Sequence, residues 1–245
     1  MGCPVNEIFS SLQGEGLYVG CRQVFIRLHG CNLHCAFCDT VLKQEPAFCR
    51  VEVTPGRRDF KYLPNPLKAG EIAAAANAFD LPLHHSVSLT GGEPLLHPSL
   101  IRELAPLLKG TRRGIYLETN GTLPEALLEV IDLIDMVAMD FKLPSVTGLP
   151  PFWDEHRRFL KIAALKEAYV KIVVGEETTY REIEKAAELI KSATAGVPLI
   201  LQPVSEIGDV RGVSPAHALE LQRQALKMLA DVRIIPQTHK MMDQL

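Results

Sequence analysis

Residues 31–38, with the sequence CNLHCAFC, place three cysteines within eight positions. Their C-x3-C-x2-C spacing offers three thiolate ligands, and no fourth cysteine lies close by in the sequence. Structural zinc sites and ordinary iron–sulfur clusters are closed by four protein ligands, whereas a catalytic metal centre keeps one coordination position open. Three thiolates suit a [4Fe–4S] cluster whose fourth iron has no protein ligand. The segment therefore predicts a catalytic metal centre rather than a structural one.

The composition around this segment is that of an ordinary globular chain. Its 245 residues are 47% hydrophobic and 22% charged, with a net charge of -3, so no basic excess indicates nucleic-acid binding. No apolar run reaches the ~18 residues of a membrane helix. The first seven residues lack the basic and apolar regions of a signal peptide. We therefore expect a cytoplasmic protein, in which clustered cysteines are metal ligands rather than disulfides.

Short apolar segments alternate with amphipathic segments after residue 38. Short, nearly continuous apolar strands are typical of a parallel sheet that is covered on both faces. The predicted strands are 24–28, 87–90, 115–118, 136–139, 170–174, 199–202 and 233–235. The predicted helices are 69–79, 99–109, 124–133, 153–166, 179–193 and 215–229. About six β/α units predict an α/β fold, either a barrel or a doubly wound sheet.

Two of these helices have clear start signals. Thr179 and Glu182 have the spacing of a capping box, in which each side chain bonds the backbone N–H of the other residue. Ser214 precedes Pro215, which suits the first position of a helix. Both signals support the predicted boundaries.

Polar or glycine-rich residues follow every predicted strand. In barrel enzymes the active site lies beyond the C-terminal ends of the strands. The seven strand exits are the cysteine segment 31–38, then 91–94 (GGEP), 119–121 (TNG), 140–142 (DFK), 175–177 (GEE), 203–205 (PVS) and 237–240 (QTHK). Because the segments that follow the seven strands would all lie at the same end of the sheet, we predict that they form one active site there. We therefore favour a partial (β/α) barrel.

The segment 41–68 interrupts this alternation. It contains four prolines and a run of charged residues, which argue against a helix. Long irregular connections are usually functional or mobile. We predict a single domain over residues 1–245, with an irregular insertion at about 41–68 that lies beside the active site or acts only as a spacer.

The cysteine spacing, with the aromatic Phe37 before the last cysteine, resembles the signature of the radical S-adenosylmethionine superfamily. The resemblance implies a [4Fe–4S] cluster on Cys31, Cys35 and Cys38, with S-adenosylmethionine chelated to the open iron. The segment 90–94 (TGGEP) is similar to the one that holds the amino group of S-adenosylmethionine in that superfamily, and its glycines let a ligand approach the backbone closely.

Further contacts to S-adenosylmethionine are implied by the same resemblance. Glu118 and Asn120 either reach this cofactor as well or act as structural caps. The residues implied to contact it are Phe37, Cys38, Asp39, Gly92, Ser145, Gln202, Pro203, Val204 and Ser205.

The segment 7–16 (EIFSSLQGEG) indicates one particular family within this superfamily. Together with Arg27, 29–33 and 39–40, it closely resembles the 7-carboxy-7-deazaguanine synthases. That family converts 6-carboxy-5,6,7,8-tetrahydropterin to 7-carboxy-7-deazaguanine with loss of ammonia, a step toward queuosine and other deazapurines. The resemblance covers most of the chain and is weak only across 41–68.

The resemblance also implies how the substrate is held. A pterin presents N–H donors that carboxylate and amide oxygens can accept, and a guanidinium suits the substrate carboxylate. The alternatives are that the QGEG segment is a plain turn and that the arginine pairs with a structural acid. The implied substrate residues are Leu12, Gln13, Gly14, Glu15, Arg27 and Thr90.

The remaining implied features are a Mg²⁺ ion on Thr40, a flavodoxin-like reductant and a homodimer. Mg²⁺ prefers oxygen ligands and keeps several waters, so one hydroxyl and a substrate carboxylate are suitable ligands. Among the histidines, His239 beside the last strand exit is the best candidate for an active-site contact.

Two other functions stay open at this point. An activating enzyme of a glycyl-radical protein uses the same cysteine spacing but needs a surface for a large partner. A non-enzymatic iron–sulfur or zinc protein requires a fourth thiolate, for which Cys3, Cys21 and Cys49 are available.

Overall fold

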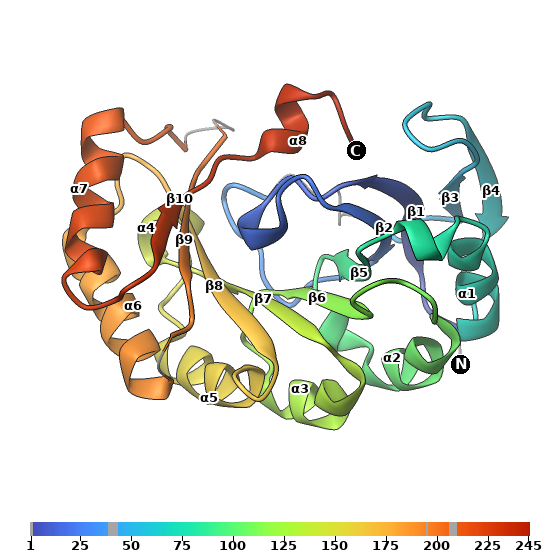
Figure 1. The fold of residues 1–245 in the computed structure, drawn as a ribbon, viewed down its shortest axis with the longest axis horizontal. Helices are drawn as coiled ribbons and strands as arrows, with labels where there is room; N and C mark the ends of the chain where they lie inside the picture. Colours follow the sequence, from blue (N-terminus) through green and yellow to red (C-terminus); the bar gives the residue numbers. More distant parts are fainter. Residues whose placement is uncertain (1, 39–43, 195, 206–209) are drawn as a thin grey trace.

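The computed structural model describes residues 2–38, 44–194, 196–205 and 210–245. Within these ranges the chain forms one ten-stranded sheet in the order β10-β9-β8-β7-β6-β5-β2-β1-β3-β4. The sheet curves into a partial barrel with helices along its outer face (Figure 1). Its parallel strands are β2 (Arg22–Leu28), β5 (Ser86–Gly91), β6 (Ile115–Thr119), β7 (Met136–Phe141), β8 (Glu167–Val174), β9 (Leu199–Pro203) and β10 (Val232–Ile234). The predicted strands are therefore confirmed.

Helices alternate with these strands, as the sequence predicts. The six predicted helices appear as α1 (Ala69–Asn77), α2 (Pro98–Leu104), α3 (Pro124–Val130), α5 (Trp153–Ala163), α6 (Tyr180–Ala193) and α7 (Pro215–Leu226). Shorter helical segments are η1 (Gly16–Tyr18), η2 (Leu81–Leu83), η3 (Pro94–Leu96), η4 (Ala105–Leu107), η5 (Ile131–Leu133), α4 (Pro144–Thr147) and α8 (Thr238–Met241). No helix in the described ranges is long and apolar enough to span a membrane.

Three further strands carry no sequence-based prediction. The N-terminal segment forms β1 (Val5–Leu12), which runs antiparallel to β2 and parallel to β3 (Phe48–Glu52). Strand β4 (Phe60–Pro64) then pairs antiparallel with β3 at the edge of the sheet.

The prediction of an irregular insertion at 41–68 is therefore wrong for residues 48–52 and 60–64, which form two paired strands. Pro46 precedes β3, Pro55 lies in the turn between the strands, and Pro64 is the last residue of β4. Prolines at turns and on edge strands leave the pairing of the sheet intact. The segment does lie beside the active-site cavity, because Phe48 and Arg50 line it.

Two apolar clusters organise the fold. The larger one fills the space between the sheet and the helices, with strand residues such as Leu117 and Val137 fully buried. A smaller cluster inside the barrel contains Tyr116 and Tyr169, whose hydroxyls share a hydrogen bond of 2.5 Å. These tyrosines lie in the N-terminal halves of their strands. This smaller apolar cluster thus closes the barrel at the N-terminal ends of the strands and leaves their C-terminal ends open.

The capping box at the start of α6 gives a test of local stability. The Thr179 hydroxyl accepts a hydrogen bond from the Glu182 backbone N–H at 3.3 Å, and the Glu182 carboxylate accepts one from the Thr179 backbone N–H at 2.9 Å. Thr179→Ala should lower the free energy of unfolding by about 1 kcal/mol. In thermal denaturation the midpoint should fall by about 2–4 °C. Glu184→Ala, at an exposed position of the same helix, is the control; equal shifts for both variants would contradict the assignment.

Candidate active site

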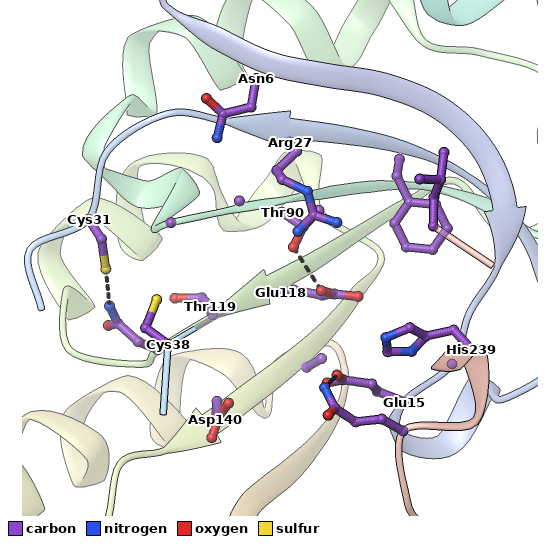
Figure 2. A pocket seen from close by; sticks show the side chains of 18 of the residues that line it. Asn6, Glu15, Arg27, Cys31, Cys38, Thr90, Glu118, Thr119, Asp140 and His239 are labelled. Atoms are coloured by element: carbon purple, nitrogen blue, oxygen red, sulfur yellow. Dashed lines mark hydrogen bonds between the residues drawn. The ribbon is translucent and has the colours of Figure 1, made fainter. Parts of the chain in front are cut away.

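The C-terminal ends of the strands open into one cavity of about 810 Å³. Cys31 and Cys38 lie toward one end, and Glu15 and His239 lie toward the other (Figure 2). Thr90 and Glu118 lie between these two groups. One cavity therefore joins the predicted metal site to the predicted substrate site.

Six of the seven predicted strand exits contribute to the described lining of this cavity. The exit after β8 does not, which corrects the prediction for 175–177. There the Glu176 carboxylate accepts a hydrogen bond from the Ser214 backbone N–H at 2.8 Å, so it supports the start of α7. Strand β8 instead contributes Lys171 and Val173 from within the strand.

Most of the predicted site residues lie on the cavity wall. Two do not: Ser145 lies in α4 and donates its backbone N–H to Glu182 at 3.0 Å, and Pro203 ends β9. Asp39 and Thr40 lie outside the described residues. The predicted residues on the wall are Leu12, Gln13, Gly14, Glu15, Arg27, Cys31, Cys35, Phe37, Cys38, Thr90, Gly92, Gln202, Val204, Ser205 and His239.

The cysteine loop leaves β2 and is held from outside the strand. Ala36 donates its backbone N–H to the Thr147 carbonyl at 2.9 Å, and Cys38 donates to the Cys35 carbonyl at 3.1 Å. Burial raises the pKa of the Cys35 thiol to about 11 and also raises the pKa of Cys31. Iron binding must therefore displace protons from these thiols. Among the described residues, no group of three or more His, Cys, Asp or Glu side chains is arranged so that it could hold a metal ion.

The other cysteines do not line the cavity that this loop faces. Cys3 and Cys49 are 3% and 0% exposed and belong to the apolar core. Cys21 precedes β2 while Cys31 follows it, and a strand of that length separates its ends by about 20 Å. Within the part of the chain that the structure describes, no fourth cysteine lines the cavity with this loop, which favours an open coordination position.

The glycines of the TGGEP segment let two backbones cross beside the cysteine loop. A Cβ atom at Gly92 would lie 2.0 Å from the Gly30 carbonyl oxygen and 3.0 Å from the Cys31 Cβ. Gly91 adopts a φ of +131°, and a Cβ there would lie 2.1 Å from the Leu28 carbonyl oxygen. Neither position can accept a side chain. The segment therefore presents bare backbone next to the cysteines.

Glu93 of the same segment is fully buried and has a structural role. Its carboxylate accepts hydrogen bonds from Leu95 N at 3.0 Å, Asn120 N at 2.7 Å and Thr119 Oγ1 at 2.8 Å. Burial raises its pKa to about 7. Glu93 thereby ties the exit of β5 to the exit of β6.

Two buried acceptors lie in the wall of the cavity. Asp140 Oδ1 and Gln202 Oε1 have no hydrogen-bond partner among the described residues, although both residues line the cavity. Buried polar atoms are almost always paired, so unpaired ones point to a missing donor. Lys142 lies 2.8 Å from Asp140 Oδ2 and 5.1 Å from the centre of the Phe37 ring. A ligand with hydroxyl or ammonium donors fits these acceptors.

Polar groups between the two ends converge on Glu118. Gln13 Nε2 donates to Glu118 Oε1 at 2.7 Å, and Thr90 Oγ1 donates to Glu118 Oε2 at 2.8 Å. Gln13 Oε1 accepts the Glu15 backbone N–H at 3.0 Å, which fixes the loop between β1 and η1. This loop is therefore more than a plain turn, because its side chains are set in the cavity wall.

Glu15 is held in its charged form. Burial favours the neutral acid, but the ion pair with Lys171 and the hydrogen bond from Gln237 at 2.6 Å lower its pKa to about 2. The C-terminal segment packs on the same loop, because a Cβ at Gly14 would lie 2.1 Å from His239 Nδ1. Gln237 lies in the predicted strand exit 237–240, whereas Lys171 carried no sequence-based prediction of a site role and only its proximity in the fold identifies it.

Arg27 pairs with an acid, as one of its two alternatives predicts, and it also lines the cavity. Its Nε donates to Glu7 Oε1 at 2.9 Å, and Glu7 is also paired with Arg50 at 2.5 Å. The guanidinium nevertheless lines the cavity above Thr90 (Figure 2). The ion pair with Glu7 therefore orients the Arg27 guanidinium, and the terminal nitrogens of Arg27 face the cavity.

Comparison with known proteins agrees with this geometry. The model of the Radical SAM superfamily matches residues 25–190, so the chain is a member of that superfamily. A 7-carboxy-7-deazaguanine synthase of Geobacter sulfurreducens is 48% identical over 247 residues, covering 100% of this chain and 98% of that protein. That of Thermococcus kodakarensis is 36% identical over 250 residues, covering 96% of each chain. This chain belongs to the family of 7-carboxy-7-deazaguanine synthases.

Solved structures share the fold. The crystal structure of QueE from Escherichia coli matches with a TM-score of 0.61 and 24% identity, covering 98% of this chain and 95% of that one. TYW1 with a lysine–pyruvate adduct bound matches with a TM-score of 0.54 and 16% identity, covering 84% and 74%. The predicted partial barrel and the predicted family are confirmed.

The separation of the cysteines leads to a test of the ligand set. Cys21→Ala and Cys49→Ala should bind as much iron and sulfide as the wild type after anaerobic reconstitution, because neither thiol lines the cavity that the loop faces. Cys31→Ala should lose the cluster, since it removes one of three ligands. Iron and sulfide content with the visible absorption spectrum measures this. Loss of the cluster in Cys21→Ala or Cys49→Ala would show a closed, four-cysteine site.

Proposed function

We propose that this chain is a radical S-adenosylmethionine lyase that converts 6-carboxy-5,6,7,8-tetrahydropterin to 7-carboxy-7-deazaguanine with release of ammonia. The observation that carries the proposal is the single cavity in which a three-cysteine loop faces a polar pocket containing Arg27, Glu15 and Glu118. Membership of the family, at full length, supports the same activity.

The residues at the metal end fit a [4Fe–4S] cluster and S-adenosylmethionine. Three thiols without a fourth cysteine beside them leave one iron for a ligand, and the glycine crossing at Gly92 exposes backbone beside it. Asp140 and Gln202 offer the two unpaired acceptors that ammonium or ribose hydroxyl donors require. When bound, these cofactors supply the electron and the carbon radical that removes hydrogen from the substrate. The protein's task is to bind, orient and shield.

The residues at the other end fit a carboxylated pterin. Glu15 remains ionised, so it can accept N–H groups from the amino-substituted edge of the ring. Glu118, set by Gln13 and Thr90, offers a second carboxylate within the same pocket. The guanidinium of Arg27 can hold the substrate carboxylate in a two-point contact. Because the pterin would be held both at its amino-substituted edge and at its carboxylate, its reacting carbon would be fixed relative to the end of the cavity that holds the cluster and S-adenosylmethionine.

Other features of the proposal rest on the sequence resemblance. They are Mg²⁺ on Thr40, which lies outside the described residues, a flavodoxin-like reductant and a homodimer. The continuous sheet supports a single domain over residues 1–245. Clustered thiols that bind metal favour a cytoplasmic location.

The activity can be tested directly. The protein is reconstituted anaerobically with iron and sulfide, then given reductant, S-adenosylmethionine, Mg²⁺ and 6-carboxytetrahydropterin. Mass spectrometry should detect 7-carboxy-7-deazaguanine with many turnovers per S-adenosylmethionine, because the cofactor is regenerated in each cycle. Omission of Mg²⁺ should lower the rate. Deoxyadenosine formed without deazaguanine, in protein with a full cluster, would reject the proposal.

Arg27 gives a test of how the substrate is bound. Arg27→Lys keeps the charge but loses the planar fork, so one charged hydrogen bond is lost. The KM for carboxytetrahydropterin should rise about 10- to 100-fold with little change in kcat. Arg22→Lys, at the exposed start of the same strand, should leave KM unchanged. A wild-type KM in Arg27→Lys would exclude a direct carboxylate contact.

A further inference from the structure

The segment 118–122 (ETNGT), at the C-terminal end of β6, places a buried asparagine against the cysteine loop. Asn120 is 5% exposed, and its Nδ2 lies 3.9 Å from Cys31 Sγ (Figure 2, dashed line to Cys31). Its backbone is fixed on both sides, because its N–H donates to Glu93 at 2.7 Å and its carbonyl accepts from His156 Nε2 at 3.2 Å. The position of Asn120 is therefore set by two buried side chains.

Hydrogen bonds also settle which way the Asn120 amide points. The backbone N–H of Thr122 can only donate, and it contacts Asn120 Oδ1 at 3.0 Å. The oxygen must therefore face Thr122, and the NH₂ group must face the cysteine loop. One N–H of that group donates to Asn32 Oδ1 at 2.8 Å. The other is directed to Cys31 Sγ.

Three side chains close this arrangement into a ring. Asn120 donates to Asn32, Asn32 Nδ2 donates to Thr122 Oγ1 at 2.8 Å, and Thr122 Oγ1 donates to Asn120 Oδ1 at 2.6 Å. Each bond in the ring polarises the next in the same sense. The ring thus locks the amide toward the sulfur.

We propose that Asn120 is a positioning residue that donates a hydrogen bond to the Cys31 thiolate of the [4Fe–4S] cluster and sets the reduction potential of that cluster. Hydrogen bonds to ligand sulfurs are among the factors that fix the potential of an iron–sulfur cluster. A donor stabilises the more negative, reduced state, so it makes the cluster easier to reduce. The inference depends on the cluster at Cys31, Cys35 and Cys38 but not on the identity of the substrate.

The test is a redox titration of the reconstituted full-length protein, followed by electron paramagnetic resonance without S-adenosylmethionine. Asn120→Ala should shift the midpoint potential to more negative values, because the donor is lost. Asn120→Asp should shift it further in the same direction, since a carboxylate adds negative charge at the same place. Iron and sulfide content establishes that the compared proteins carry equal amounts of cluster.

Thr122 provides matched variants that leave Asn120 in place. Thr122→Ser keeps the hydroxyl and should have the wild-type potential. Thr122→Val opens the ring and should show a smaller negative shift than Asn120→Ala. A wild-type potential in fully loaded Asn120→Ala would overturn the proposal. If that variant holds no cluster, Thr122→Val decides, and a wild-type potential there would overturn it. Because no product is measured, failure here is distinct from failure of the proposed activity.

Discussion

The backbone crossing at Gly92 and Gly30 is the constraint on which the rest of the site depends. With any side chain at Gly92, the exit of β5 and the cysteine loop could not occupy their observed positions, since 2.0 Å is far below any allowed contact. The crossing places the loop over the carboxyl ends of the parallel strands, where polar residues of neighbouring strands converge. Glu93 then extends the constraint to β6 through its bonds to Thr119 and Asn120.

Charge is distributed along the cavity in an alternating chain. Glu15 pairs with Lys171, Lys171 lies 3.4 Å from Asp140, and Asp140 pairs with Lys142. Each buried charge has a partner of opposite sign, which limits the cost of removing it from water. The chain runs from the loop that faces the substrate end to the side chain over Phe37. The two ends of the cavity are therefore electrostatically connected by residues of the barrel wall.

Much of this architecture can be predicted from the sequence because parallel strands leave little choice. Their C-terminal ends must meet at one edge, so the order of residues along the chain is enough to group the polar residues that follow each strand. The exit at 175–177 is the exception, because Gly-Glu-Glu serves the turn and supports the start of α7 through Glu176. Local spacing alone cannot separate a turn from a site.

Strand β1 and the ion pairs escape prediction for different reasons. Strand β1 is buried on both faces and carries Glu7 and Ser10, which are satisfied by distant partners, so it shows no alternation of apolar and polar residues. Lys171 and Glu15 are separated by 156 positions, and no local pattern links them. Only the fold brings such pairs together.

The loops at the two ends of the cavity differ in how far along the sequence their hydrogen-bond partners lie. The cysteine loop takes its partners from Asn120, Thr122 and Thr147. The Glu15 loop instead bonds Gln237, which lies 222 residues away, and Thr238. These partners of the cysteine loop therefore all lie before residue 148, whereas one wall of the substrate end is made by the last helical segment of the chain.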